Sequence, residues 1–321
     1  MSGPWQLLAL PPMEAGMLEA LFAGEGISVV VPAERTAAAV EQLLPTVDLV
    51  LGDWTGTLRL DAAGPRVCFV QQPSVGFDGI DVEAFAAAGV PVANCAGSNT
   101  VSVAEWCLTA TLALLKRTVA ADAAVRAGEW PQTSLGGREL AGCRVGVVGM
   151  GPIGRRVAGM FGALGCEVSY WSRSRHPDAP AAYAPLDDLL ATSDIVVLVI
   201  ALGDQTRGLL DAERLARLKP GALLVNGARG AVVDEDALVA ALRSGQVGGA
   251  ALDVFATEPL PAGSPLRELP GVLLSPHMAG STSEAAMRIV AQSKANLRRA
   301  VEGEPVVDVV NGAHPQVRRR T

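Results

Sequence analysis

Short apolar runs alternate with stretches of helical periodicity along the first part of the chain. The apolar runs lie at Leu7–Leu10, Ile27–Val31, Leu49–Leu51 and Val67–Val70. The helical stretches lie at Met13–Ala23 and Ala37–Leu44. Strands that alternate with helices predict a parallel sheet, because parallel neighbours need a crossover connection.

A second alternating series follows Cys143. Its strands are predicted at Val145–Val148, Val168–Trp171, Ile195–Ile200, Ala222–Val225 and Gly249–Leu252. Its helices are predicted at Leu186–Ala191, Glu213–Arg217 and Glu235–Arg243. One connecting helix is expected from Thr100 to about Arg126, because no turn residue occurs before Gly128, and a final helix from Glu284 to about Glu302. The predicted fold class is therefore α/β, with two doubly wound parallel-sheet domains of the Rossmann or flavodoxin type and a cleft between them.

The second series opens with a glycine pattern, Gly149-x-Gly151-x-x-Gly154, between an apolar run and a helical stretch. In such a strand–turn–helix unit the first glycine permits a tight turn, the second lets the backbone approach a pyrophosphate, and the third lets the helix pack closely. The pattern predicts a dinucleotide site, with the helix N-terminus directed at the phosphates. Residues 99–287 are thus expected to form a dinucleotide-binding domain, and residues 1–98 with 288–321 a substrate domain.

Composition narrows the class of protein. Half of the 321 residues are apolar and the formal net charge is −7, which indicates a globular protein and argues against nucleic acid as a partner. Five scattered cysteines without CxxC spacing argue against disulfides and a metal site. The apolar stretch from Val103 to Leu115 is too short for a membrane span, and no signal peptide is expected. The protein is predicted to be cytoplasmic.

The dinucleotide is predicted to be NADP(H), with NAD(H) as the alternative. The strand after the glycine turn ends in Ser172, Arg173 and Ser174, where NAD sites place a carboxylate for the ribose hydroxyls. Ser172 leaves room for a 2′-phosphate and Arg173 can form a charge-assisted contact with it. The other explanation is that Arg173 and Arg175 are ordinary solvated charges.

Six further segments occur in a recognisable order. They are Ser74–Asp81, Gly89–Asn94, Asn99–Glu105, Asn226–Gly230, Asp253–Pro259 and Ser275–Gly280. Together they resemble the motifs of the D-isomer-specific 2-hydroxyacid dehydrogenases, a family that includes glyoxylate, hydroxypyruvate and phosphoglycerate dehydrogenases. The resemblance covers about residues 70 to 285.

The resemblance implies a catalytic trio of Arg229, Glu258 and His277. The chemistry agrees, because reduction of a 2-oxo acid needs a cation for the carboxylate and an acid for the developing alkoxide. Arg229 presents a planar fork suited to a carboxylate, the imidazole of His277 can give a proton in one direction and take it in the other, and Glu258 can orient its ring. Each residue also has an ordinary explanation when taken singly. Arg229 could be a surface charge, His277 a structural histidine, and Glu258 the start of a turn at Glu258-Pro259.

The resemblance also implies binding residues outside the trio. The N–H groups of Val75 and Gly76 are expected to bind the substrate carboxylate, together with Arg229 and His277, and Asp253 to hold the nicotinamide carboxamide. The other expected cofactor contacts are Gly149, Gly151, Pro152, Ile153, Gly154, Ser172, Arg173, Ser174, Thr100, Leu202, Thr206, Gly227, Ala228, Ala279 and Gly280. The pocket for the substrate side chain is expected near Trp54, Gln72 and Phe77. Two departures from the family pattern weaken this set: Ala201-Leu202 stands where proline is frequent, and Gly227 lacks a hydroxyl or thiol.

The predicted reaction is hydride transfer between NADP(H) and a small 2-oxo acid or D-2-hydroxy acid, as in glyoxylate or hydroxypyruvate reductases. Phosphoglycerate dehydrogenase is one alternative, although residues 50–77 offer a phosphate only Arg59 and Arg66. A dinucleotide-sensing protein related to corepressors is another. Glu258, where formate dehydrogenases have an amide, favours 2-oxo acids over formate. A homodimer is expected because the helix at Val101–Leu115 is strongly apolar.

Overall fold

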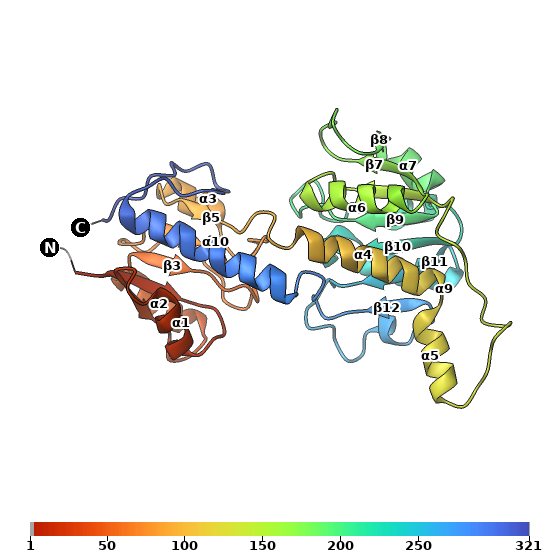
Figure 1. Ribbon diagram of the computed structural model, residues 1–321, viewed down its shortest axis with the longest axis horizontal. Helices are drawn as coiled ribbons and strands as arrows, with labels where there is room; N and C mark the ends of the chain where they lie inside the picture. Colours follow the sequence, from red (N-terminus) through yellow and green to blue (C-terminus); the bar gives the residue numbers. More distant parts are fainter. Residues whose placement is uncertain (1–2, 321) are drawn as a thin grey trace. The chain divides into compact units, whose positions relative to one another are not determined.

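The computed structural model describes residues 3–320, which divide into two compact units. Unit 1 contains the residues up to Ser98 and those from Ser283 onward, and unit 2 runs from Asn99 to Thr282. Each unit is built on one parallel sheet with helices on both faces (Figure 1), which confirms the α/β class and the two parallel-sheet domains. The sequence predicts the second domain boundary after residue 287. In the structure, unit 2 ends at Thr282 and the chain returns to unit 1 at Ser283, where its last helix begins.

Unit 1 has a five-stranded sheet in the order β2-β1-β3-β4-β5. The strands are β1 (Trp5–Ala9), β2 (Ile27–Val30), β3 (Leu49–Leu51), β4 (Phe69–Gln71) and β5 (Val92–Ala93). The helices are α1 (Ala15–Phe22), α2 (Ala37–Leu43), the 3-10 turn η1 (Leu44–Thr46), α3 (Val82–Ala87) and α10 (Ser283–Glu302). Successive strand residues face opposite cores: Leu7 packs with α1 and α10, and Leu8 with α2 and α3.

Unit 2 has a seven-stranded sheet in the order β12-β11-β10-β9-β6-β7-β8. The strands are β6 (Arg144–Val148), β7 (Glu167–Trp171), β8 (Ala182–Tyr183), β9 (Ile195–Leu198), β10 (Ala222–Asn226), β11 (Val247–Leu252) and β12 (Val272–Leu274). The helices are α4 (Thr100–Leu115), α5 (Thr118–Arg126), α6 (Pro152–Ala163), α7 (Leu186–Thr192), α8 (Ala212–Arg217) and α9 (Glu235–Ser244), with 3-10 turns η2 (Gly230–Val232) and η3 (Pro265–Arg267). Helices α4 and α6 cover one face of this sheet, and α7, α8 and α9 cover the other.

The single helix predicted from Thr100 to Arg126 is wrong. The chain breaks between α4 and α5, where Arg117 adopts a left-handed conformation with φ of 51°. The N–H of Arg138 donates to the carbonyl of Leu115 at 2.9 Å, so a segment that follows α5 satisfies the end of α4. Lysine and arginine are good helix formers, and the sequence at the break therefore gives no stop signal.

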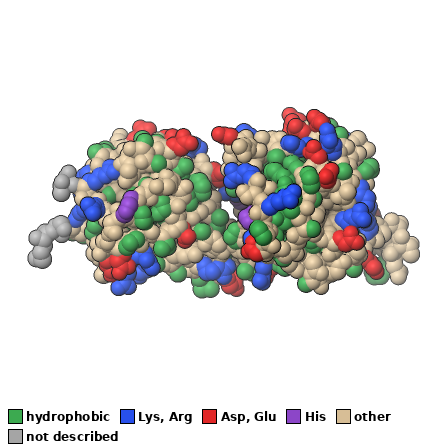
Figure 2. Space-filling view, turned by 90° about the horizontal axis from the view of Figure 1, so that it is seen from above, with side chains coloured by type: hydrophobic (Ala, Val, Ile, Leu, Met, Phe, Trp, Pro, Cys, Tyr) green, Lys and Arg blue, Asp and Glu red, His purple; other side chains and the backbone are tan. Residues whose placement is uncertain are grey.

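The surface is mixed in charge. Basic and acidic side chains are interspersed over the face shown in Figure 2, in keeping with the modest net charge. Among residues 3–320, no helix combines the length and the apolar character that a bilayer crossing requires.

Candidate active site

The glycine turn between β6 and α6 has the geometry of a phosphate cradle. Gly149 has φ of +108°, and a Cβ there would lie 2.7 Å from the carbonyl oxygen of Val199. A Cβ on Gly154 would overlap the carbonyl of Gly149, whereas a Cβ on Gly151 would meet no atom within 4 Å. The protein's own packing therefore requires Gly149 and Gly154, while Gly151 keeps a space open in front of the turn.

Helix α6 starts at this open space. Its first residue is Pro152, and no side chain caps the N-terminus. The first N–H groups of an uncapped helix need an acceptor, and together with the helix dipole they favour an anion. The turn and the helix start therefore fit the pyrophosphate of a dinucleotide.

A cavity of about 370 Å³ lies beyond the carboxyl end of β7. Its lining residues are Trp171, Arg173, Pro185, Leu186, Asp187, Gln205, Leu209 and Arg214. Arg175 does not line it and instead lies over the ring of Tyr183, 4.4 Å from the centroid. Ser172 is buried, and its hydroxyl donates to the carbonyl of Ser174 at 2.6 Å. The cavity therefore offers two guanidinium groups, one of them Arg173.

The three predicted catalytic residues follow three neighbouring strands. Arg229 lies just past β10, Glu258 lies in the loop after β11, and His277 lies just past β12. These strands are adjacent and parallel, so their carboxyl ends lie at the same edge of the sheet. That edge is where ligands bind in doubly wound sheets.

His277 and Glu258 form a direct pair. The Nδ1 of His277 lies 2.6 Å from Oε2 of Glu258, and the two side chains are 48% and 34% exposed. The backbone of His277 is left-handed, with φ of 53°, and its N–H donates to the carbonyls of Asp253 and Ser275 at 2.8 and 3.0 Å. Because Nδ1 is occupied by the carboxylate, Nε2 is the ring atom left to exchange a proton with a ligand.

Glu258 is held as a carboxylate. Burial raises its pKa, but the hydrogen bond with His277, the N–H of Phe255 at 3.0 Å and the charge of Arg229 lower it by more. The pKa of Glu258 therefore lies below its ordinary value, and the group is ionised at neutral pH. An ionised Glu258 can accept a hydrogen bond from Nδ1 of His277 and so fix the orientation of the ring.

The loop that carries Arg229 is fixed by Asn226, the last residue of β10. The amide oxygen of Asn226 accepts from the N–H of Ala228 at 3.0 Å, and its amide nitrogen donates to the carbonyl of Arg229 at 3.2 Å. A Cβ at Gly230 would overlap the backbone of Phe255. The glycine therefore lets the loops after β10 and β11 approach closely, so that the charge of Arg229 acts on Glu258.

Comparison with known proteins assigns the family. The model of the D-isomer specific 2-hydroxyacid dehydrogenase NAD binding domain matches residues 108–279. The chain belongs to this family. A glyoxylate reductase of Aeropyrum pernix is 41% identical over 266 residues, which is 79% of this chain and 79% of that protein.

Two further similarities bear on the family assignment. A D-3-phosphoglycerate dehydrogenase of Mycobacterium leprae is 43% identical over 254 residues, 78% of this chain but 48% of that protein. The chain thus spans about half the length of that relative. The crystal structure of a glyoxylate reductase from Paecilomyes thermophila superposes with a TM-score of 0.88 at 28% identity, covering 96% of this chain and 99% of that one.

Asp253 organises the loop that carries His277. One of its carboxylate oxygens accepts from the hydroxyl of Ser275 at 2.6 Å and the N–H of Met278 at 2.8 Å, and the other accepts from the N–H of Ala279 at 2.8 Å. Asp253 is 2% exposed. The family resemblance assigns it to the nicotinamide carboxamide, and in this structure the carboxylate also fixes the segment that carries His277. Sequence reasoning did not identify Asn226, which fixes the loop of Arg229, or Ser275, which bonds Asp253, although each is the first residue of a family motif.

The other residues expected to contact the cofactor lie in unit 2, at strand ends or helix starts. Thr100 opens α4, Leu202 and Thr206 lie in the loop after β9, Gly227 and Ala228 follow β10, and Ala279 and Gly280 follow β12. Thr206 is buried, and its hydroxyl bonds the N–H of Gly203 and the carbonyl of Ala201, both at 2.8 Å. It therefore shapes its loop. Val75 and Gly76 lie in unit 1, in the loop after β4.

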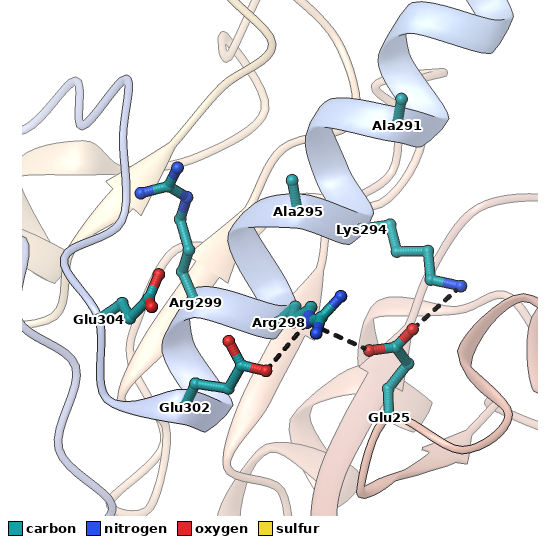
Figure 3. A pocket seen from close by; sticks show the side chains of 8 residues that line it. All are labelled: Glu25, Ala291, Lys294, Ala295, Arg298, Arg299, Glu302 and Glu304. Carbon is teal, nitrogen blue, oxygen red and sulfur yellow. Dashed lines mark hydrogen bonds and ion pairs between the residues drawn. The ribbon is translucent and has the colours of Figure 1, made fainter.

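A larger groove of about 420 Å³ lies along α10 in unit 1, and it contains none of the predicted site residues (Figure 3). Four of its charged residues pair with each other: Glu25 with Lys294 at 3.2 Å and with Arg298 at 3.9 Å, and Arg298 with Glu302 at 2.9 Å. Paired surface charges offer little to a ligand. Within residues 3–320, no group of three or more His, Cys, Asp or Glu side chains could hold a metal ion.

Proposed function

We propose that the protein interconverts a small 2-oxo acid and its D-2-hydroxy acid with a nicotinamide dinucleotide. Glyoxylate and hydroxypyruvate are the substrates that we favour. The proposal depends mainly on one observation, the 2.6 Å distance between Nδ1 of His277 and Oε2 of Glu258. Arg229 follows β10, which lies beside the strand that precedes Glu258. Membership of the dehydrogenase family supports it.

The three side chains divide the work. A bound nicotinamide dinucleotide would supply or accept the hydride. The guanidinium of Arg229 binds the substrate carboxylate through its planar fork and polarises the 2-oxo group. His277 gives a proton from Nε2 to the carbonyl oxygen during reduction and takes it back during oxidation. Glu258 keeps the ring oriented through Nδ1 and stabilises the imidazolium before the proton leaves.

Unit 1 contributes the recognition of the substrate in this proposal. The N–H groups of Val75 and Gly76 bind the carboxylate, and Trp54 and Phe77 face the substrate's side chain. Trp54 is 44% exposed, which leaves it available to a ligand. Gln72 is 4% exposed, and its amide donates to the carbonyl of Asp53 at 3.2 Å and to Ser74 Oγ at 2.9 Å, so its role is to support the loop.

The preferred dinucleotide is proposed to be NADP(H). Arg173 and Arg214 both line the cavity beyond β7, which lies where the adenosine ribose binds in this type of fold. Asp187 also lines it, but its carboxylate lies 3.5 Å from Arg214 and 3.7 Å from Arg217, so its charge is offset. Because Asp187 in turn engages Arg214, Arg173 is the cation that favours a 2′-phosphate at this cavity.

Phosphoglycerate dehydrogenase is the second candidate, because a relative with that name is 43% identical over the matched region. The cations that a phosphate would need are already engaged. Arg66 pairs with the buried Asp48 at 2.8 Å, and Arg59 pairs with Asp61 at 3.3 Å. The arrangement therefore favours a substrate without a phosphate.

A steady-state screen tests the function. The purified protein is assayed with glyoxylate, hydroxypyruvate, pyruvate, phenylpyruvate and 3-phosphohydroxypyruvate, each with NADPH and with NADH. We expect turnover with the unphosphorylated acids and a lower KM for NADPH than for NADH. Higher kcat/KM for 3-phosphohydroxypyruvate than for hydroxypyruvate would favour the second candidate. A clear preference for NADH would overturn the cofactor assignment, and no turnover with any acid would favour a dinucleotide-binding role.

The protein is also proposed to be a homodimer, through α5 and the segment after it. This arm extends away from the sheet of unit 2 (Figure 1). None of the nine residues of α5 is buried, and Val119, Val125 and Trp130 are 64%, 52% and 77% exposed. A helix this short is marginal in water without a packing partner. The apolar helix α4, from which a dimer was predicted, packs instead on α6 and the sheet of its own unit.

Light scattering tests the dimer. We expect twice the chain mass of 33.0 kDa at micromolar concentration, and about one chain mass for the double variant Val125→Asp, Trp130→Ser. A charge on a desolvated apolar face is costly, which is why the variant should dissociate. The matched control is Val307→Asp, an exposed valine in unit 1. A monomeric wild type, or a double variant that stays dimeric, would contradict this assembly.

The five cysteines are free thiols. Burial raises the pKa of Cys107 to about 12 and that of Cys68 to about 11, so both stay protonated and unreactive. Free, unreactive thiols support the proposal that the protein works in the reducing cytoplasm.

A further inference from the structure

The loop that follows β4 in unit 1 is tied to the end of β5. The two strands are neighbours, and Gln72 N–H donates to the carbonyl of Ala93 at 2.7 Å, which places Asn94 beside the start of the loop. Asn94 is 6% exposed. Its side-chain nitrogen donates to the carbonyl of Val75 at 2.7 Å. A side chain from the next strand therefore holds the middle of the loop.

Two more contacts fix the neighbouring carbonyls. The N–H of Cys95 donates to the carbonyl of Ser74 at 2.9 Å. The hydroxyl of Ser74 donates to the carbonyl of Gly76 at 2.6 Å, and it accepts from the amide of Gln72 at 2.9 Å. Three consecutive carbonyls, at residues 74, 75 and 76, are thus all bonded within the protein.

The direction of the N–H groups follows from these bonds. In a trans peptide the C=O and the following N–H point in opposite directions. Since the carbonyls of Ser74 and Val75 point toward Cys95 and Asn94, the N–H groups of Val75 and Gly76 point away from them. Neither N–H donates to another residue in the part of the chain that the structure describes. The loop thus presents two adjacent, fixed donors, which is the arrangement that an anion requires.

The side chain of Asn94 contains an unfavourable feature that a purely structural role does not explain. Its amide oxygen is buried and has no hydrogen-bond partner among residues 3–320. An unpaired buried acceptor is unfavourable. We propose that Asn94 is a positioning residue. By holding the carbonyl of Val75, it turns the Val75–Gly76 peptide so that the N–H of Gly76 binds the substrate carboxylate, and Ser74 holds the carbonyl of Gly76 on the other side of the loop. This rests on the proposed function, which assigns these two N–H groups to the carboxylate.

Kinetics of Asn94→Ala test the proposal. The donors touch a carboxylate that is present in both the ground state and the transition state, so losing their alignment should raise KM and change kcat little. We expect KM for glyoxylate or hydroxypyruvate to rise about 10- to 100-fold, the range for hydrogen bonds to a charged group. KM for NADPH should stay within about twofold. Asn94→Asp, which cannot donate and adds a negative charge, should show the larger rise.

A matched control separates positioning from stability. Asn311 also bonds backbone groups in unit 1, since its amide donates to the carbonyl of Val90 at 2.8 Å and accepts from Val92 N–H at 3.1 Å. Asn311→Ala should lower the melting temperature and leave KM unchanged. If Asn94→Ala does not fold, Ser74→Ala takes its place, with a smaller rise in KM expected.

Binding of oxamate distinguishes the possible failures. This carboxylate is not reduced, and its dissociation constant can be measured on the dinucleotide-loaded protein by calorimetry. We expect weaker binding to Asn94→Ala in parallel with KM. If the wild type turns over but Asn94→Ala and Ser74→Ala both keep its KM and its oxamate affinity, the positioning role is wrong and the function stands. If the wild type neither turns over a 2-oxo acid nor binds oxamate, both proposals fail. If it binds oxamate without turnover, the comparison of variants still decides the positioning role.

Discussion

His277→Ala is expected to lower kcat for 2-oxo acid reduction by about 10²–10⁴-fold, the usual contribution of a general acid. The ring is the proton donor in our proposal, and alanine leaves only solvent to protonate the alkoxide. Because Nδ1 of His277 is bonded to Glu258, the lost group is the one at Nε2. KM for NADPH should change little, since the glycine turn and the cavity beyond β7 are untouched.

The control for His277 is His314→Ala. His314 lies in unit 1, where its Nδ1 accepts from the N–H of Gln316 at 3.1 Å. Glu258→Gln should lower kcat less than His277→Ala does, because an amide can still orient the ring but cannot stabilise the imidazolium. A kcat for His277→Ala within about threefold of the wild type would remove His277 from the chemistry.

Arg229→Ala is expected to lower kcat/KM by about 30- to several-thousand-fold, which corresponds to about 2–5 kcal/mol for loss of one member of a desolvated charge pair. Unlike His277→Ala, it should raise KM for the 2-oxo acid as well as lower kcat. The reason is that the guanidinium binds the carboxylate in the ground state and stabilises charge on the carbonyl oxygen in the transition state. Steady-state kinetics with hydroxypyruvate measure both effects.

Arg229→Lys refines this test. Lysine keeps the charge but not the planar fork, so it should recover only part of the loss. The matched control is Arg243→Ala, which removes an arginine from the last turn of α9 in the same unit. Full activity of Arg229→Ala, or a loss confined to the NADPH KM, would contradict the assignment of Arg229 to the substrate carboxylate.

Sequence periodicity was sufficient for the long, regular elements. The alternation of apolar runs and helical stretches predicted the strands of both sheets except β12, at the edge of the sheet of unit 2, and β5 and β8, which have two residues each. Such short strands carry too few positions for a pattern, and neighbouring strands hold them in place. The turn between α4 and α5 was also missed, because the residues at the break carry no stop signal and the bond that satisfies the end of α4 comes from Arg138, twenty-three residues after Leu115.

The sequence by itself determined the fold class, the glycine turn and the residue types of the proposed catalytic trio, because these are local patterns of hydrophobicity, backbone freedom and motif order. Only the tertiary structure decided which groups act on one another. Glu258 and His277 lie on the loops of different strands, and the parallel pairing of β11 and β12 is what makes Nδ1 and Oε2 neighbours. In the same way, Asn94 reaches Val75 because β5 lies beside β4. Such contacts depend on the order of strands in a sheet, which residue spacing does not encode.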